Sequence, residues 1–306
     1  MRVVIIGQQA FGKAALDAFL ARGDTVAGVF APPDADGRTD PLTVGARERG
    51  VPLFQFARYT VPEAHAALAG SEADIAVMAY VTAFVPQSFC SVPRYGTIQF
   101  HPSLLPLHRG PAAINWAVIL GRPKTGLTIF RPTDGLDEGP VVLQKEVEIR
   151  ADDTTGSVYF EKIFALGIAS LIEAAELVVS GRAREWAQDE SQATYEGWVH
   201  EAAAQINWAY HVDTVYNLIR GCNPSPGAWT TLDGRKLSLF EARKITARTF
   251  GQVRGKRIGT VVAADDKSFT VCAQGGFIEV FRCRFENGKK IPAGAAGIAA
   301  GTALGT

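Results

Sequence analysis

The sequence predicts an α/β fold, in which a mostly parallel sheet with helices on both faces is followed by a small β-barrel domain. Over the first hundred residues, short β-branched runs alternate with stretches of helical periodicity, which is typical of a parallel sheet covered by helices. From about residue 204, short strand-like runs are separated by turn dipeptides such as Asp-Gly and Asn-Gly, which favours antiparallel hairpins. Short strands of this kind close into small barrels.

The N-terminal elements follow one another in the order that a parallel sheet requires. An apolar run at 3–6 predicts the first strand, and apolar residues at helical spacing predict a helix over 12–22. Strands are expected next at 26–30, 52–54, 75–79 and 96–100, with a helix at 44–49. Such sheets bind ligands beyond the carboxyl ends of their strands, which is where His101 lies.

The next segment surrounds a loop that contains Asp137. We predict a helix at 111–120, strands at 126–130 and 141–149 on either side of this loop, and a long amphipathic helix at 156–180. These elements complete a catalytic domain over 1–182, and the mixed polar composition of 183–203 predicts a linker.

The C-terminal domain is expected over 204–306. A helix at 213–219 precedes strands at 229–230, 236–240, 258–262, 269–271 and 277–280. The residues from about 292 onward are rich in Gly and Ala, so we expect a disordered tail there.

The composition is that of an ordinary soluble globular protein, with 47% hydrophobic and 20% charged residues. No run of about 18 apolar residues occurs, and the N-terminus has no signal-peptide pattern, so we expect a cytoplasmic protein without a membrane partner. The four cysteines are scattered without Cys-x-x-Cys spacing, which indicates reduced, mostly buried thiols rather than a disulfide framework or a metal site.

The charge is distributed unevenly although the formal net charge is zero. Residues 204–306 hold 14 Lys and Arg against 7 Asp and Glu, a balance of +7, which leaves −7 for residues 1–203. A basic C-terminal domain could bind an anion such as RNA or a polyglutamate tail. A solvated basic surface without a specific partner is the interpretation that we favour.

His101 and Asp137 are the main candidates for catalysis. His101 ends an apolar strand and is followed by the proline-stiffened loop Pro102–Pro106, which can hold its side chain in a fixed orientation. A histidine can transfer protons near neutral pH, and a carboxylate from the Asp137 loop would stabilise its imidazolium form. The alternative is a histidine buried only for packing, and the sequence alone does not prove that the two side chains meet.

Gln99 is a third candidate. It lies two residues before His101, so both side chains should point to the same side of an extended strand. Its carboxamide could donate a hydrogen bond to a carbonyl oxygen as negative charge develops there. A polar residue at the rim of a cleft that only binds water is the alternative.

An apolar stretch at 78–86 could form the wall of a pocket for a flat heterocycle. Ordinary core packing is the alternative, and for this stretch alone it is the better interpretation. Asp134 could equally cap its own turn. The residues that we predict to bind the ligand are Tyr80, Phe84, Val85, Pro86, Ser103, Leu104, Leu105 and Asp134.

The segment Gly7–Gly12 follows the first strand as a dinucleotide-binding loop would. It lacks the G-x-G-x-x-G spacing, and no acidic residue ends the second strand, so we expect no NAD. A tight turn that lets the following helix pack close to the sheet is the better interpretation.

These residues, in this order, resemble the folate-dependent formyltransferase family. The matching segments are His101-Pro102-Ser103-Leu104-Leu105-Pro106, Arg109-Gly110 and Gly135-Leu136-Asp137-Glu138-Gly139. Further similarities favour the branch formed by the N-terminal hydrolase domains of 10-formyltetrahydrofolate dehydrogenases over the methionyl-tRNA formyltransferases. These are Ile6-Gly7-Gln8, Asp40-Pro41-Leu42, Ile114-Asn115-Trp116, Ala193-Thr194-Tyr195-Glu196-Gly197 and Pro226-Gly227-Ala228-Trp229.

The resemblance implies 10-formyltetrahydrofolate as formyl donor, a Rossmann-like N-terminal domain and a C-terminal barrel related to the OB fold. It implies catalytic roles for His101 and Asp137, without a metal. Transferases of the family usually have Asn two residues before the histidine, where this chain has Gln99. The role of Gln99 therefore stays open.

The formyl acceptor is expected to be water or a small amine, which would make the chain a hydrolase or a transferase that releases tetrahydrofolate. Transfer to an amino sugar or to methionyl-tRNA is the alternative within the enzyme class, and a folate-binding sensor without turnover is the alternative outside it. The loop 33–40 carries three acids and one base, which disfavours a phosphate-rich tRNA. We expect a monomer or a weak dimer.

Overall fold

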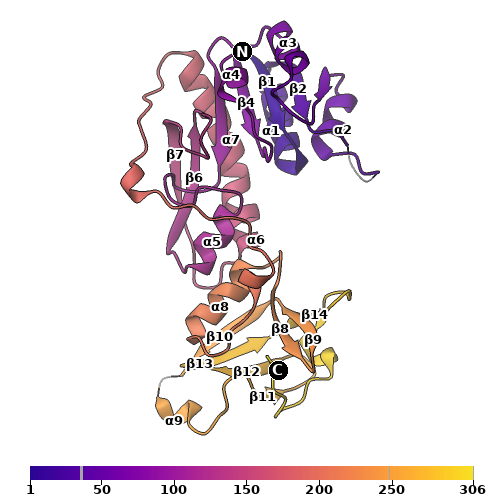
Figure 1. Cartoon of the computed structure of the whole chain (residues 1–306), viewed down its shortest axis with the longest axis vertical. Helices are drawn as coiled ribbons and strands as arrows, with labels where there is room; N and C mark the ends of the chain where they lie inside the picture. The colour runs from indigo at the N-terminus through magenta and orange to yellow at the C-terminus, as the bar shows by residue number, and fades with distance from the viewer. Residues whose placement is uncertain (35–36, 248, 306) are drawn as a thin grey trace. The chain divides into compact units, whose positions relative to one another are not determined.

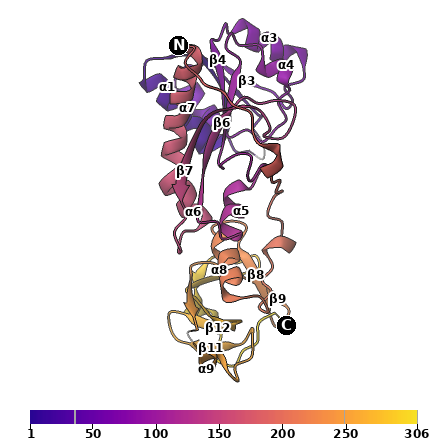
Figure 2. The same ribbon diagram turned by 90° about the vertical axis from the view of Figure 1, so that its left-hand side faces the viewer.

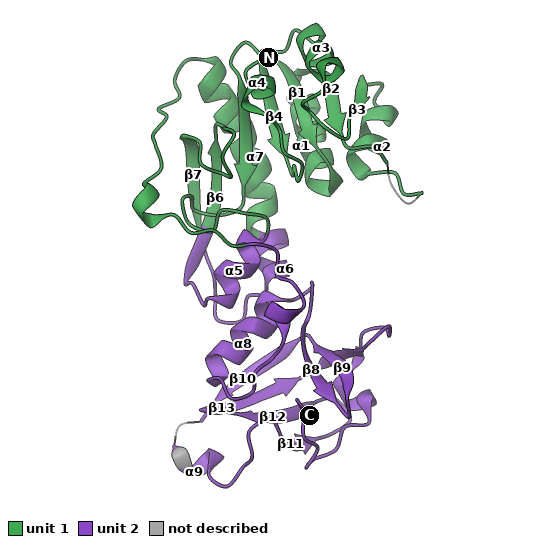
Figure 3. Cartoon of the chain, viewed as in Figure 1, with its two compact units in different colours: residues 1–111, 126–147, 162–196 green, residues 112–125, 148–161, 197–306 purple. Residues whose placement is uncertain are grey.

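The structure, a computed structural model, describes residues 1–34, 37–247 and 249–305. It divides the chain into two compact units, shown in Figure 3: unit 1 holds residues 1–111, 126–147 and 162–196, and unit 2 holds residues 112–125, 148–161 and 197–306. These bounds differ from the expected ones. Residues 183–196, which we interpreted as linker, belong to unit 1, and two segments from the predicted catalytic domain belong to unit 2.

Unit 1 is built on a seven-stranded sheet with the order β3-β2-β1-β4-β5-β6-β7 (Figure 1). The first five strands in this order pair in parallel, whereas β6 pairs antiparallel with β5. The mostly parallel sheet is therefore confirmed. Its strands are β1 (Arg2–Gly7), β2 (Thr25–Ala31), β3 (Leu53–Gln55), β4 (Ile75–Ala79), β5 (Thr97–His101), β6 (Lys124–Phe130) and β7 (Val141–Glu148).

Helices cover both faces of this sheet, as predicted (Figure 2). On one face Phe11 of α1 packs against Phe100 of β5, with ring centroids 4.4 Å apart, and against Phe164 of α7 at 5.3 Å. On the other face Ile6 of β1 shares a buried cluster with Leu68 of α3. The helices of unit 1 are α1 (Gln9–Ala21), α2 (Pro41–Glu48), α3 (Pro62–Gly70), α4 (Gln87–Cys90) and α7 (Phe164–Val179).

The helix predicted at 156–180 is interrupted. The structure has a short α6 (Thr155–Ser157), then a π-helical segment Val158–Ile163, and then α7. Thr154 caps α6 by accepting a hydrogen bond from Ser157 N at 3.1 Å. The apolar periodicity shows where helical backbone forms but does not distinguish the two kinds of helical turn.

Two glycines allow β1, β4 and α1 to approach one another closely. A Cβ on Gly7 of β1 would lie 2.1 Å from the carbonyl oxygen of Ala79 in β4, and one on Gly12 of α1 would lie 3.4 Å from the same oxygen. This close packing confirms the interpretation of 7–12 as a turn that brings the helix against the sheet.

Gly7→Ala is therefore expected to lower the free energy of unfolding by roughly 1–3 kcal/mol, because the clash is with backbone and forces β1 and β4 apart. Urea denaturation measures the change. Gly70→Ala at the end of α3 is the control, since its Cβ would meet nothing within 4 Å, and we expect a change within about 0.5 kcal/mol. Equal stability of the two variants would contradict the close approach.

Unit 2 contains two antiparallel four-stranded sheets, with the orders β10-β13-β12-β11 and β15-β14-β9-β8. Its helices include α5 (Ala113–Ile119) and α8 (Val212–Gly221), which are joined by a hydrogen bond from Asn115 Nδ2 to Gly221 O at 2.8 Å. The remaining elements are α9 (Phe250–Val253), β8 (Ala228–Leu232), β9 (Arg235–Leu239), β10 (Ala242–Thr246), β11 (Val261–Ala264), β12 (Phe269–Ala273), β13 (Gly276–Val280), β14 (Arg282–Phe285) and β15 (Ile291–Pro292).

The prediction of a disordered tail from about 292 is wrong for the residues that the structure describes, which end at 305. Leu304 is buried and donates a backbone hydrogen bond to Gly259 O at 2.8 Å, and Gly305 N donates to Thr231 O at 2.8 Å. Small residues here serve close packing, since a Cβ on Gly294 would lie 2.2 Å from Asp266 backbone. Composition alone does not separate this use of Gly and Ala from disorder.

Candidate active site

The carboxyl ends of three neighbouring strands define one edge of the sheet in unit 1. The pairing register aligns Gly7 of β1 with Ala79 of β4, and Met78 of β4 with Gln99 of β5. His101 is the last residue of β5 and therefore lies at this edge, as predicted. In parallel sheets this edge is the usual place for a ligand.

His101 and Asp137 meet at this edge. The loop between β6 and β7 places the Asp137 carboxylate so that Oδ2 lies 3.5 Å from His101 Nδ1. Each side chain is only 7% exposed, so the pair interacts in a largely water-excluded setting. Two residues that are 36 positions apart in the sequence thus form one buried pair.

The other ring nitrogen of His101 faces a backbone acceptor. Nε2 lies 2.8 Å from the carbonyl oxygen of His108. A carbonyl oxygen can only accept, so Nε2 carries the proton in this bond. Nδ1 faces Asp137 Oδ2, so a proton on Nδ1 would lie between the ring and a carboxylate oxygen that can accept a hydrogen bond from it.

A backbone N–H also fixes the Asp137 carboxylate. Gly110 N donates to Asp137 Oδ2 at 2.9 Å. Gly110 has φ of +109°, and a Cβ there would lie 2.4 Å from Glu196 O, so only glycine fits this position. The Arg109-Gly110 pair of the sequence thus includes one direct contact to the candidate catalytic carboxylate.

Arg109 is fully buried at the centre of a polar network. Its guanidinium donates to Glu190 at 2.9 and 2.6 Å, to Gln188 Oε1 at 3.2 and 2.8 Å, and to the Tyr195 hydroxyl. The hydrogen bonds to Glu190 are the main cause that raises the pKa of Arg109. These partners lie in the stretch that we had interpreted as linker, and no local pattern in the sequence marks Gln188 or Glu190.

The predicted ligand-binding loop 103–105 is held by internal contacts. Ser103 is buried and its hydroxyl donates to Leu107 O at 2.6 Å, while Leu105 N donates to Thr128 Oγ1 at 3.1 Å. Leu104 lies against Gly126 of β6, where an added Cβ would come within 2.5 Å of it. These contacts stiffen the loop behind His101, and ligand binding by the three residues stays a prediction.

The stretch at 80–86 divides between surface and core. Tyr80 and Phe84 are 41% and 60% exposed, so their rings are available to a ligand. Val85 is buried in the core cluster, which agrees with the alternative of ordinary packing, and Pro86 is half-buried at the start of α4. Asp134 Oδ1 accepts a hydrogen bond from Gln87 N at 2.8 Å and so connects its loop to α4.

Gln99 lies on β5 and is half-buried. Within the part of the chain that the structure describes, its carboxamide makes no hydrogen bond. The donor that the oxyanion role requires is therefore present without a competing partner.

The cysteines do not offer an alternative nucleophile. All four are buried free thiols, and burial raises the pKa of Cys90 and of Cys222 to about 12. Such thiols stay protonated at neutral pH. Across 1–34, 37–247 and 249–305, no group of three or more His, Cys, Asp or Glu side chains is placed to hold a metal, and no helix there is long and apolar enough to cross a membrane.

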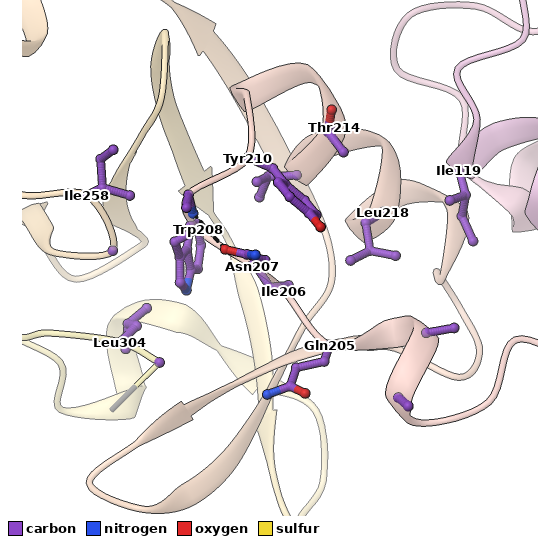
Figure 4. A pocket seen from close by; sticks show the side chains of 16 residues that line it. Ile119, Gln205, Ile206, Asn207, Trp208, Tyr210, Thr214, Leu218, Ile258 and Leu304 are labelled. Carbon is purple, nitrogen blue, oxygen red and sulfur yellow. Dashed lines mark hydrogen bonds between the residues drawn. The ribbon is translucent and has the colours of Figure 1, made fainter.

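A separate pocket of about 760 Å³ lies in unit 2 (Figure 4). Trp208, Tyr210 and Leu218 line it together with the amides of Gln205 and Asn207. The sequence analysis did not predict it, and it contains neither member of the His–Asp pair.

The fold and the site together define a class of protein: an α/β chain with a histidine–aspartate pair at the carboxyl edge of its sheet, followed by an antiparallel C-terminal domain. Comparison with known families agrees with this description. Residues 1–174 match the family described as "Formyl transferase", and residues 199–297 match "Formyl transferase, C-terminal domain". The chain belongs to the formyl transferase family.

Relatives of the chain include two kinds of enzyme. It is 35% identical over 303 residues to the mitochondrial 10-formyltetrahydrofolate dehydrogenase of Mus musculus, covering 96% of this chain and 33% of that protein. It is 31% identical over 301 residues to the methionyl-tRNA formyltransferase of Geotalea uraniireducens (strain Rf4), covering 96% of this chain and 93% of that protein. The chain thus spans about a third of the dehydrogenases that it matches.

Solved structures share the fold. HypX from Aquifex aeolicus in complex with tetrahydrofolic acid superposes with a TM-score of 0.67 and 18% identity, covering 97% of this chain and 48% of that chain. WlaRD, a sugar 3N-formyl transferase, superposes with a TM-score of 0.68 and 15% identity, covering 94% and 99%. These likenesses support the predicted architecture.

Proposed function

We propose that the chain removes the formyl group of 10-formyltetrahydrofolate and passes it to water or to a small amine. Family membership supports folate-dependent formyl transfer. The observation that carries the proposal is the contact of Asp137 Oδ2 with His101 Nδ1 at 3.5 Å, at the edge where a parallel sheet binds its ligand. No metal or NAD takes part in the proposed reaction.

The reaction needs one proton transfer from the nucleophile and one to the leaving group. Water, or an amine, attacks the formyl carbon, and the Asp137–His101 pair accepts the proton that the nucleophile loses. The carbonyl oxygen of the formyl group becomes an oxyanion, toward which Gln99 can donate. The bond between the formyl carbon and N10 then breaks, and the proton held by the Asp137–His101 pair passes to N10. This leaves tetrahydrofolate and either a formamide or, with water as the nucleophile, formic acid, which releases its remaining acidic proton to solvent and becomes formate. Acid–base steps of this kind contribute roughly 10²–10⁴-fold to a rate.

The exposed rings of Tyr80 and Phe84 are suited to stack on the flat pterin of the folate. Backbone groups of the stiff loop 103–105 and the loop around Asp134 would complete the folate site. Val85 and Pro86 would contribute indirectly, by packing beneath the segment that carries Tyr80 and Phe84.

The acceptor is decided by incubating the protein with 10-formyltetrahydrofolate alone. We expect tetrahydrofolate and formate to accumulate over many turnovers if water is the acceptor, and only after a small amine is added if the chain is a transferase. Both rates should be unchanged by a chelator such as EDTA. Activity that disappears with the chelator and returns with a divalent metal would contradict the proposed chemistry.

A second candidate is formyl transfer to methionyl-tRNA or to an amino sugar. The methionyl-tRNA formyltransferase relative, which this chain matches over 93% of its length, favours it. The acidic composition of the loop 33–40 argues against a phosphate-rich tRNA. Asp40 in this loop also has a structural role, because it accepts hydrogen bonds from Gln9 N and Leu42 N, each at 2.9 Å. Asp36 lies outside the described residues. Tight folate binding with no deformylation for any acceptor would instead indicate a folate sensor.

A further inference from the structure

Gln188 makes contacts with two different parts of the candidate active site. Its Oε1 accepts hydrogen bonds from Arg109 Nε and Nη2, at 3.2 and 2.8 Å. Its Nε2 donates to the carbonyl oxygens of Asp137 and Gly139, each at 2.8 Å. One amide thus connects two parts of the site. One is Arg109, the fully buried charged residue of the 106–110 loop, and the other is the backbone around the candidate catalytic residue Asp137.

The polarity of these partners fixes the orientation of the amide. Arg109 can only donate, so an oxygen must face it, and the two carbonyls can only accept, so an N–H group must face them. A carboxamide has both an oxygen that accepts and an N–H group that donates, and Gln188 uses both. A hydrocarbon side chain would satisfy neither end, and a carboxylate would satisfy Arg109 but set oxygen against oxygen at the two carbonyls.

The backbone at 137–139, which Gln188 holds, is also constrained by its own geometry. Asp137 has φ of +55°, and a Cβ on Gly139 would lie 1.5 Å from the carbonyl oxygen of Arg131, so the backbone is pressed against its neighbour at that point. The Asp137 carbonyl, held by Gln188, and the Asp137 carboxylate, held by Gly110 N, are the two ends of one residue. Fixing both ends fixes the direction in which the carboxylate faces His101.

We propose that Gln188 is a positioning residue that sets the Asp137 carboxylate toward His101. It does so without touching the reacting atoms. Its hydrogen bonds connect the buried Arg109 to the backbone at 137–139 and hold that backbone in place. This inference rests on the proposed function, since it assigns Gln188 a role only if the His–Asp pair is catalytic. Displacing a catalytic group by about 1 Å can cost about 10²-fold in rate, so the effect should be measurable.

The test compares Gln188→Glu with the wild-type chain in the 10-formyltetrahydrofolate assay. The variant keeps the size of the side chain and the oxygen toward Arg109 but removes the two donors. We expect kcat to fall at least about 10-fold while KM for the folate stays within about twofold. Gln192→Ala is the matched control, because Gln192 lies in the same segment, is exposed and donates to Asp189 at 2.6 Å, and its kcat should stay within about twofold.

A double-mutant cycle separates positioning from a merely structural role. If Gln188 acts through the carboxylate, adding Gln188→Glu to Asp137→Asn should change the single-turnover rate by less than about twofold. Equal losses in both backgrounds would overturn the proposal, as would a wild-type kcat in Gln188→Glu. If Gln188→Glu does not fold, as judged by its melting curve, Gln188→Met replaces it. Met adds no charge and removes the two donors together with the oxygen that faces Arg109.

Failure of the inference is distinguishable from failure of the proposed function. A wild-type rate in Asp137→Asn would remove the catalytic role of the pair and with it the basis of this inference. A large loss in Asp137→Asn together with a wild-type rate in Gln188→Glu would remove the role of Gln188 alone.

Discussion

Replacing His101 by alanine is expected to lower kcat for release of tetrahydrofolate from 10-formyltetrahydrofolate at least about 10²-fold. The imidazole belongs to the pair that accepts the proton of the nucleophile and passes it to N10, and it is the histidine that the structure places against Asp137. Steady-state kinetics with the purified chain measure the effect. KM should change much less than kcat, because the ring contributes to the transition state rather than to binding of the folate.

The fold of this variant needs its own measurement. Removing the ring removes one hydrogen bond to the buried His108 carbonyl, which costs about 1–3 kcal/mol, so the urea midpoint should fall but the protein should stay folded. His200→Ala is the matched control, because His200 is exposed in unit 2, and its kcat should stay within about twofold. Near wild-type turnover in a folded His101→Ala variant would refute the assignment.

Asp137→Asn is expected to lower kcat at least about 10²-fold as well. The side chain keeps its size, and an amide oxygen can still accept from Gly110 N, so the loop should retain its conformation. What is lost is the negative charge 3.5 Å from His101 Nδ1, which stabilises the imidazolium that forms during the reaction.

The control for this variant is Asp189→Asn. Asp189 is exposed and accepts hydrogen bonds from Ser191 and Gln192 within its own segment, which lower the pKa of its carboxyl group. Its removal should leave kcat within about twofold. A loss in Asp189→Asn as large as that in Asp137→Asn would show that any nearby charge change has the same effect, which contradicts a specific role for Asp137.

The architecture was largely predictable because the pattern of the strands is strong. Apolar runs such as 3–6 and 75–79 are buried on both faces, and such runs indicate central parallel strands. The antiparallel pairing of β6 with β5 was not predicted in particular, since direction depends on tertiary pairing and not on local pattern. The Gly- and Ala-rich tail was misinterpreted because its order depends on long-range contacts such as that of Leu304 with Gly259.

The site was predictable only in part. His101 could be predicted because the end of a strand and the following prolines mark its position in the sequence. The catalytic role of Asp137 was predicted from the resemblance to the family. Gln188 and Glu190 were missed because they lie about 80 residues from Arg109, in a polar stretch without periodicity. The neighbouring segment Ala193–Gly197, which resembles the family, could have drawn attention to this stretch, because Thr194 and Glu196 contact the loop at 106–110.

The central claim is that this chain deformylates 10-formyltetrahydrofolate with the His101–Asp137 pair. The most direct test follows tetrahydrofolate formation from 10-formyltetrahydrofolate by the wild-type chain and by His101→Ala in parallel, with water alone and with a panel of amines. We predict many turnovers by the wild-type chain in at least one condition, and a rate at least about 10²-fold lower for the variant in that condition. No tetrahydrofolate beyond one equivalent of protein in any condition, from a wild-type chain shown to bind the folate, would contradict the account.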